Sequence, residues 1–213
     1  MGCHRYGGIM IELARRRMTM RAKPYDAEVE WLGSTGTQYI DTLYYPNINT
    51  EIRLTFVPFT STGPNYLCGC CSVNYKTQVL SMLKTKDENN LRLFFGGNVS
   101  SGMGNYYGDY QYVGDIYMNK FYVSLDGVRY YYTEIPSTTS ISHTLYVYAR
   151  NNIGVADFFV EFKLKSLYIS ENAQLVRSFI PVRKNGVGYL YDKVSGQLFG
   201  NQGTGQFIIG PDK

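Results

Sequence analysis

The side chains best suited to hold a ligand are tyrosines that alternate with amides and acids in a glycine-rich segment, residues 100–112. A sugar presents apolar C–H faces and hydroxyl edges, which suit tyrosine rings beside amide or carboxylate groups, and tyrosine loses little rotamer entropy on contact. The pattern predicts glycan binding on an irregular loop; the alternative is that the rings pack over the sheet rim or against a neighbouring subunit. Two tyrosines beside Pro46-Asn47 are further candidates. The candidate ligand-binding residues are Asn105, Tyr106, Tyr107, Asp109, Tyr110, Tyr44 and Tyr45.

Groups that could catalyse a reaction are sparse. Hydrolysis of a glycosidic bond needs two carboxylates that flank the bond. Asp109 and Asp115 are loop acids without a defined separation, and lysines lie between Glu161 and Glu171. His143 has no serine or cysteine partner identifiable from the sequence. We therefore predict that the protein is not an enzyme and assign no catalytic residue.

The potential metal ligands do not form a known pattern. Calcium needs clustered oxygen ligands, and the acids available could meet only through the tertiary fold. These acids are Asp109, Asp115 and Asp157. Cys68, Cys70 and Cys71 have a spacing that fits neither a zinc knuckle nor a disulfide framework. We predict that they are small apolar fillers of a buried strand, since a metal or redox site would need partners that two histidines hardly supply. No metal and no cofactor are expected.

The positive charge is concentrated at the N-terminus. Residues 1–25 carry six Lys or Arg and one acid, whereas the remainder carries a net charge of −1 within a total of +4. A near-neutral body argues against nucleic-acid binding. No apolar stretch is long enough to span a membrane, and no signal peptide is visible. We predict that residues 1–27 are a flexible or briefly helical basic leader, with Met10 as an alternative start, which could also dock on an acidic partner.

The rest of the chain, residues 28–213, is predicted to be one all-β domain. Tight-turn residues separate apolar-alternating segments, and no convincing helical period occurs. In 50–57 the apolar residues take every second position, Asp126-Gly127 is a strong hairpin signal, and a slip in the 158–170 alternation predicts a β-bulge near residues 165–167. The other predicted strands are 29–32, 37–42, 66–71, 78–83, 90–95, 115–123, 143–150, 175–183 and 188–201. This pattern favours a two-sheet antiparallel sandwich.

Several motifs in order resemble the LamG-like, concanavalin-type jelly rolls that are abundant in gut bacteria of the Bacteroides group and in their phages and prophages. The resemblance covers about residues 28–212 and lies in four blocks. These blocks are Ser34-Thr35-Gly36-Thr37-Gln38-Tyr39-Ile40-Asp41-Thr42 with Pro46-Asn47, Leu145-Tyr146-Val147-Tyr148-Ala149-Arg150-Asn151, Phe179-Ile180-Pro181-Val182-Arg183 and Gly188-Tyr189-Leu190-Tyr191-Asp192. It implies two curved antiparallel sheets and a lectin-like concave face. The Glu-x-Asp-x-x-Glu motif of the retaining glucanases of this superfamily is absent.

The resemblance and the residues together predict a non-enzymatic, lectin-like adhesion or decoration module. The expected setting is a phage or prophage virion, or otherwise the bacterial cell surface, with a glycan and other assembly proteins as partners. One alternative is a purely structural protein that joins subunits of a particle, and a second is a polysaccharide-active enzyme. Asp192 and Asn201 are predicted to order turns rather than to bind a ligand.

Overall fold

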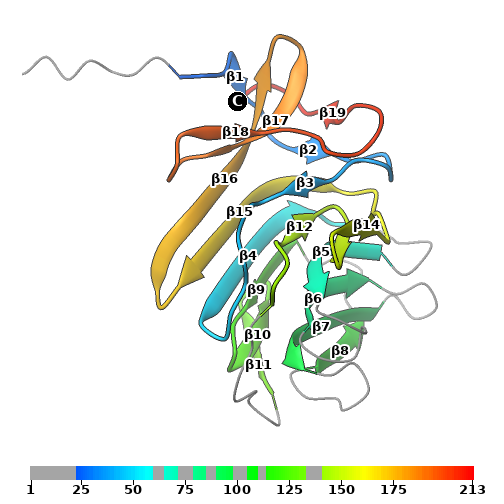
Figure 1. The fold of residues 1–213 in the computed structure, drawn as a ribbon, viewed down its shortest axis with the longest axis vertical. Helices are drawn as coiled ribbons and strands as arrows, with labels where there is room; N and C mark the ends of the chain where they lie inside the picture. The colour runs from blue at the N-terminus through cyan, green and yellow to red at the C-terminus, as the bar shows by residue number, and fades with distance from the viewer. Residues whose placement is uncertain are drawn as a thin grey trace, which may run out of the picture.

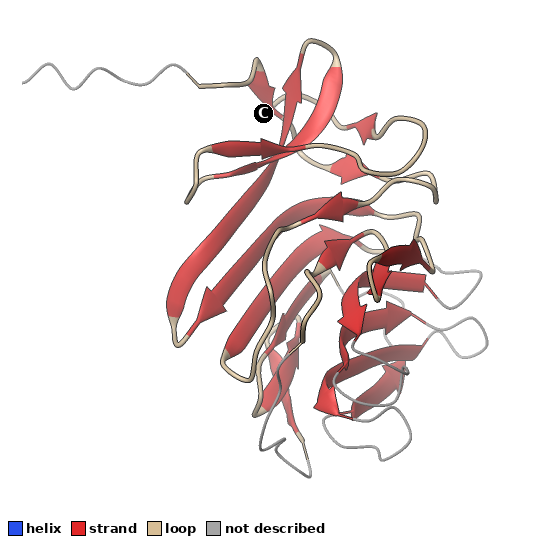
Figure 2. Cartoon of the chain, viewed as in Figure 1, coloured by secondary structure: helices blue, strands red, loops and turns tan. Residues whose placement is uncertain are grey.

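The computed structural model describes residues 23–59, 65–71, 79–84, 90–97, 105–109, 114–132 and 141–213. Every regular element within these ranges is a β-strand, as Figure 2 shows. The same ranges contain no helix with the length and apolar character that a membrane span requires. The predicted all-β, two-sheet fold is confirmed.

The larger of the two sheets, called the large sheet below, carries most of the N-terminal and C-terminal strands (Figure 1). Its strands are β1 (Ala27–Glu28), β2 (Leu32–Gly33), β4 (Thr50–Val57), β9 (Asp115–Met118), β10 (Tyr122–Leu125), β11 (Val128–Tyr131), β15 (Lys163–Glu171), β16 (Gln174–Lys184), β17 (Val187–Asp192), β18 (Gln197–Phe199) and β19 (Ile208–Ile209). The order is β11-β10-β9-β4-β15-β16-β17-β18, with β1 paired to β16 and β2 paired to both β15 and β19. Strand β4 therefore lies between β15 and β9.

The second sheet, the small sheet, is built from the middle of the chain. Its strands are β3 (Ile40–Asp41), β5 (Asn65–Cys71), β6 (Val79–Lys84), β7 (Asn90–Gly97), β8 (Asn105–Asp109), β12 (Tyr146–Val147), β13 (Arg150–Asn152) and β14 (Val155–Asp157). The order is β14-β13-β5-β6-β7-β8, and β12 pairs with β3 and β5. The prediction of a wholly antiparallel sandwich needs correction, because β13 runs parallel to β5.

Alternation along the strands builds the core between the two sheets. In β4 the side chains of Ile52, Leu54 and Phe56 are buried, whereas Glu51 and Arg53 face the other side of the sheet. The small sheet contributes residues such as Leu67 and Cys68 to the same apolar cluster. Burying such side chains stabilises the fold by roughly 1.5 to 3 kcal/mol each. The other face of β4 is thereby left for polar side chains.

Tyr148 anchors the end of the core nearest the C-terminal strands. Its side chain is fully buried, its ring lies against Phe162 and Phe207, and its hydroxyl donates to the Leu32 carbonyl at 2.6 Å. Burial raises the pKa of this phenol well above its ordinary value. The hydroxyl therefore stays protonated and acts as a fixed donor between β2 and the core.

Several strand predictions need correction, and two other predictions are confirmed. The predicted strand 143–150 is divided between β12 and β13, and the predicted strand 188–201 is divided between β17 and β18. The predicted strand 115–123 is two strands, β9 and β10, separated by a turn, and the strand predicted to begin at Phe158 begins at Lys163. Residues 105–109 form strand β8 rather than an irregular loop. The register of β15 against β4 shifts between Leu164 and Ser166, which confirms the bulge. The Asp126-Gly127 hairpin is also confirmed, with φ of 45° and 90°, both positive as a type I′ turn requires.

The described N-terminal residues lie against the C-terminal strands (Figure 1). Tyr25 is buried beside Ile180 and Val182, and β1 pairs with β16. Contacts with the C-terminal strands are therefore present from Tyr25 and Asp26 onward. Residues 1–22, which hold most of the predicted leader, lie outside the described residues.

Two turn-ordering predictions in this C-terminal part are confirmed. The fully buried Asp192 carboxylate accepts from the backbone N–H groups of Ser178, Val194 and Ser195. The Asn201 side chain accepts from the Gly203 N–H and donates to the Gly205 carbonyl. Both side chains hold backbone turns in place.

Candidate functional site

The structure places the predicted tyrosine-rich candidates on an edge strand. Asn105, Tyr106, Tyr107 and Asp109 lie in β8, which pairs only with β7 among the described strands. The orientations of their side chains, and the whole of Tyr110, lie outside the described residues. Their role in glycan binding stays a prediction.

The second pair of candidates is split between interior and surface. Tyr44 is 7% exposed and its hydroxyl contacts Thr50 Oγ1 at 2.8 Å and donates to Glu171 Oε2 at 3.3 Å. Burial raises the pKa of Tyr44 to about 12. Tyr45 is 60% exposed. Of the two, only Tyr45 presents most of its side chain to a ligand.

The acids considered for catalysis or calcium binding lie in separate places. Asp115 in β9 pairs with Arg53 of the large sheet, whereas Asp157 in β14 pairs with Arg150 of the small sheet. No group of three His, Cys, Asp or Glu side chains within the described ranges is arranged to hold a metal ion. Cys68, Cys70 and Cys71 of β5 are fully buried, which confirms their predicted place as core side chains.

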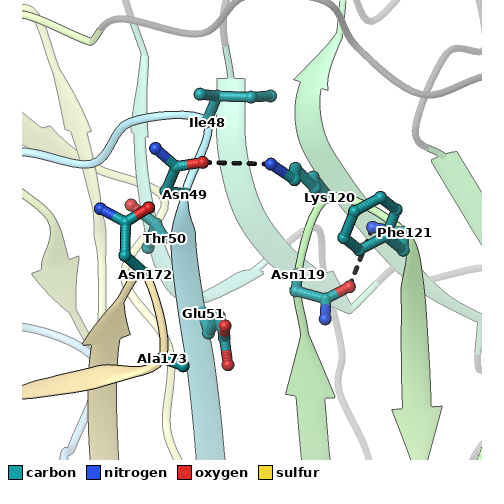
Figure 3. Close-up of a pocket in the computed structure, with 9 residues that line it drawn as sticks. All are labelled: Ile48, Asn49, Thr50, Glu51, Asn119, Lys120, Phe121, Asn172 and Ala173. Carbon is teal, nitrogen blue, oxygen red and sulfur yellow. Dashed lines mark hydrogen bonds between the residues drawn. The ribbon is translucent and has the colours of Figure 1, made fainter.

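Three turns meet at one end of the large sheet and form a cavity of about 220 Å³, called the turn pocket (Figure 3). The turns precede β4, join β9 to β10 and join β15 to β16, so they meet because β15, β4 and β9 are neighbours. The lining residues are Ile48, Asn49, Thr50, Glu51, Asn119, Lys120, Phe121, Asn172 and Ala173. Three carboxamides, a carboxylate, an ammonium group and an aromatic ring therefore surround one small cavity.

Local hydrogen bonds fix the walls of the turn pocket. Lys120 Nζ donates to Asn49 Oδ1 at 3.1 Å across the pocket (Figure 3). Asn119 Oδ1 accepts from the backbone N–H groups of Phe121 and Tyr122 at 2.9 and 3.0 Å. Asn172 has a φ of 51° and donates its backbone N–H to the Asn49 carbonyl. Phe121 lines the pocket with 47% of its surface exposed.

A row of outward side chains, most of them long, crosses the large sheet beside this pocket. Residues directly opposite one another on adjacent strands lie close together, and the register aligns one outward residue from each of five strands. From β15 to β11, the row is Tyr168, Arg53, Tyr117, Ser124 and Arg129. A shallow groove of about 250 Å³ lies along its β4 to β11 part.

Two aromatic rings, those of Tyr117 and Tyr122, line this outer-face groove, and Tyr131 lies next to Tyr122. The ring centroids of Tyr117 and Tyr122 are 5.4 Å apart, and those of Tyr122 and Tyr131 are 5.6 Å apart. Tyr131, on the edge strand β11, is 69% exposed. The Arg129 guanidinium lies 4.8 Å from the Tyr122 ring centroid. The groove and its edge thus present three rings with polar groups beside them.

Tyr117 joins the groove to the turn pocket. Its hydroxyl donates to Glu51 Oε2 at 2.7 Å and accepts from Asn119 Nδ2 at 3.0 Å, and both partners line the pocket. Burial is the main cause that raises the pKa of the Tyr117 phenol, and the hydrogen bond to the Glu51 carboxylate raises it further. Tyr117 therefore remains a donor, and the two cavities share one hydrogen-bonded wall.

Sequence reasoning missed these residues although part of the signal was present. Tyr122 and Tyr131 are opposite one another in the hairpin recognised from Asp126-Gly127. Their alternation with Val123 and Tyr130 marks them as outward-facing. Tyr117 could not be added from the sequence, because a single strand over residues 115–123 would place Tyr117 and Tyr122 on opposite faces.

Comparison with known proteins adds little to this picture. No protein-family model matches the chain, and no curated protein matches it in sequence. Among solved structures, the chain is similar to a native heptameric SAP-like pentraxin from Limulus polyphemus, with a TM-score of 0.49 and 14% identity. The match covers 88% of this chain and 96% of that one.

Proposed function

We propose that the protein is a non-enzymatic glycan-binding module and that the turn pocket and the outer-face groove together form its binding site. The observation that carries this proposal is the combination of exposed rings with fixed amide and carboxylate groups on one continuous surface. Phe121 and Tyr122 can contact the C–H faces of sugar rings, and carboxamides of the turn pocket can bond the hydroxyl edges.

The rigidity of the surface supports binding without a large conformational change. Tyr117, Tyr122 and Tyr131 stand on paired strands, and Asn119 is held by two backbone N–H groups. Little side-chain freedom is then left to lose when a ligand binds, which favours affinity. Tyr106 and Tyr107 on β8 remain a separate proposed contact, on the small sheet.

The test is a glycan array followed by calorimetry on the best ligand. Phe121→Ala and Tyr122→Ala are each expected to weaken binding about tenfold or more, since loss of a ring contact at a binding site commonly costs more than about 1 kcal/mol. Val194→Ala is the control, because Val194 is similarly exposed, at 49%, but lies in the β17–β18 turn. Binding that survives both aromatic substitutions would overturn the assignment of the site, and loss only in a Tyr106→Ala/Tyr107→Ala variant would move it to β8.

A specific observation favours self-association as a second function. The β13–β14 hairpin exposes Ile153, Val155 and Phe158 at 42%, 66% and 43%. Such apolar groups suit a contact with a second copy in a particle or surface assembly. Sedimentation at increasing concentration should show oligomers that Val155→Asp disperses, whereas a monomer at all concentrations would exclude this function for the isolated chain.

The proposed setting, a phage or prophage virion or a bacterial cell surface, rests on the sequence resemblance. The basic residues of the first 25 positions suit docking on an acidic assembly partner. Portal and tail genes beside the coding sequence would support a virion, and outer-membrane transport genes would support the cell surface.

A further inference from the structure

The acids of the candidate site are all held by neighbouring groups. Asp115 accepts from Arg53 Nε at 3.2 and 3.0 Å through its two oxygens, and from Thr55 Oγ1 at 2.9 Å. Glu51 accepts from the Tyr117 hydroxyl. Asp126, at the hairpin tip, accepts from the backbone N–H of Asp115 at 2.8 Å. Each of these carboxylates therefore accepts a hydrogen bond from within the protein, and Asp115 is also paired with a cation.

Two cations of the same surface are not engaged by acids. Lys120 and Arg129 have no carboxylate within ion-pairing distance among the residues that the structure describes. Lys120 Nζ instead bonds the Asn49 amide and lies 5.2 Å from the Phe121 ring centroid, and Arg129 lies over the Tyr122 ring. Each cation is thus held beside one of the rings proposed to contact a sugar.

From this distribution of charges we propose that the site selects acidic glycans, specifically chains of uronic acids. The proposal rests on the proposed glycan-binding function. Arg129, in the groove, presents a planar guanidinium that matches a carboxylate in two parallel hydrogen bonds. Lys120, at the turn pocket, can bond a second carboxylate further along the same chain. A neutral glycan would leave both charges unused.

The net charge of the body after residue 25 does not produce this selectivity. The body after residue 25 is nearly neutral, so a polyanion gains little from long-range attraction, which salt screens in any case. The specificity instead lies in two cations fixed beside aromatic rings. Binding of uronic acids should consequently fall only moderately with salt, whereas non-specific binding of a polyanion falls steeply.

The test compares oligogalacturonates with the same oligomers after reduction of their carboxyl groups. Wild-type protein is expected to bind the acidic form about tenfold more tightly, and Arg129→Gln and Lys120→Gln should each weaken that binding about fivefold, as expected for one charged hydrogen bond that is partly exposed. Lys193→Gln removes the same charge from an exposed position in the β17–β18 turn and should change nothing. Urea midpoints of all three variants should match the wild type.

The outcomes separate this inference from the proposed function. Equal affinity for acidic and reduced oligomers, with both lost in Phe121→Ala, would overturn the acidic selectivity and leave glycan binding standing. Binding to neither form, nor to any glycan on the array, would count against both proposals. An equal loss in Lys193→Gln, or comparable binding of single-stranded RNA or of dextran sulfate, would show general attraction of polyanions and would also overturn the inference.

Discussion

Replacing Asp192 by alanine should destabilise the protein more than the same replacement of any exposed acid. The carboxylate is fully buried, and it accepts from Ser178 N at 2.8 Å, Val194 N at 3.1 Å and Ser195 N at 3.3 Å. Ser178 is itself buried, so its N–H would lose its acceptor without gaining water, at about 1 to 3 kcal/mol. The other two donors lie in an exposed turn, where water can replace the carboxylate at about 0.5 kcal/mol each.

The expected loss is therefore about 3 kcal/mol for Asp192→Ala, or about 6 to 12 °C in Tm for a domain of this size. Asp192→Asn keeps Oδ1 for Ser178 and Val194 and should cost only about 1 kcal/mol. Urea unfolding followed by tyrosine fluorescence gives both values. The control is Asp212→Ala, because Asp212 is exposed and pairs with Arg183 at 2.8 Å, an arrangement worth at most about 1 kcal/mol. If Asp192→Ala loses no more than Asp212→Ala, the burial argument is wrong.

Three further predictions concern a hydrogen bond, a backbone conformation and the pKa of buried tyrosines. Tyr117→Phe removes the hydroxyl between Glu51 and Asn119 and should weaken glycan binding about fivefold while costing about 1 kcal/mol of stability, measured by calorimetry and urea unfolding; unchanged affinity would contradict the shared wall. Ile153→Asn should stabilise by about 1 kcal/mol, because Ile153 has a φ of 53° before Gly154 at 87° and asparagine tolerates this conformation, so a lower urea midpoint would refute the strain. Burial raises the pKa of Tyr44 and of Tyr146 to about 12, so the stabilisation that these phenols provide is complete below pH 10 and is lost as the pH rises from 10 to 12. The decrease in the urea midpoint between pH 9 and pH 11 should therefore be smaller for Tyr44→Phe than for the wild type.

The fold could be predicted largely because local patterns and tertiary packing agree. In β4, period-two alternation alone separates Ile52, Leu54 and Phe56 from the outward side chains, and the structure has the same division. Asp126-Gly127 gave the hairpin because few other residue pairs accept two positive φ angles. The bulge in β15 was visible because one extra residue moves the apolar set to the opposite face.

The candidate site was harder to predict because its residues come from five strands and three turns. Asn49, Asn119 and Asn172 are far apart in sequence and meet only because β15, β4 and β9 are adjacent. Nothing local distinguishes these asparagines from others that merely order turns, as Asn201 does. Strand order depends on long-range pairing, which a single sequence does not reveal.

The location of the site follows because the two faces of the large sheet are under different constraints. The inward positions of β4, β9 and β10 must stay apolar, because they pack against the small sheet. The outward positions carry no such constraint, yet they are held in fixed register by the same backbone ladder. Tyr117, Tyr122 and Arg129 are therefore positioned at no cost to the core, and their substitution should change binding before it changes folding. The opposite holds for Asp192, whose removal should lower stability while the affinity of the remaining folded protein for a glycan stays the same.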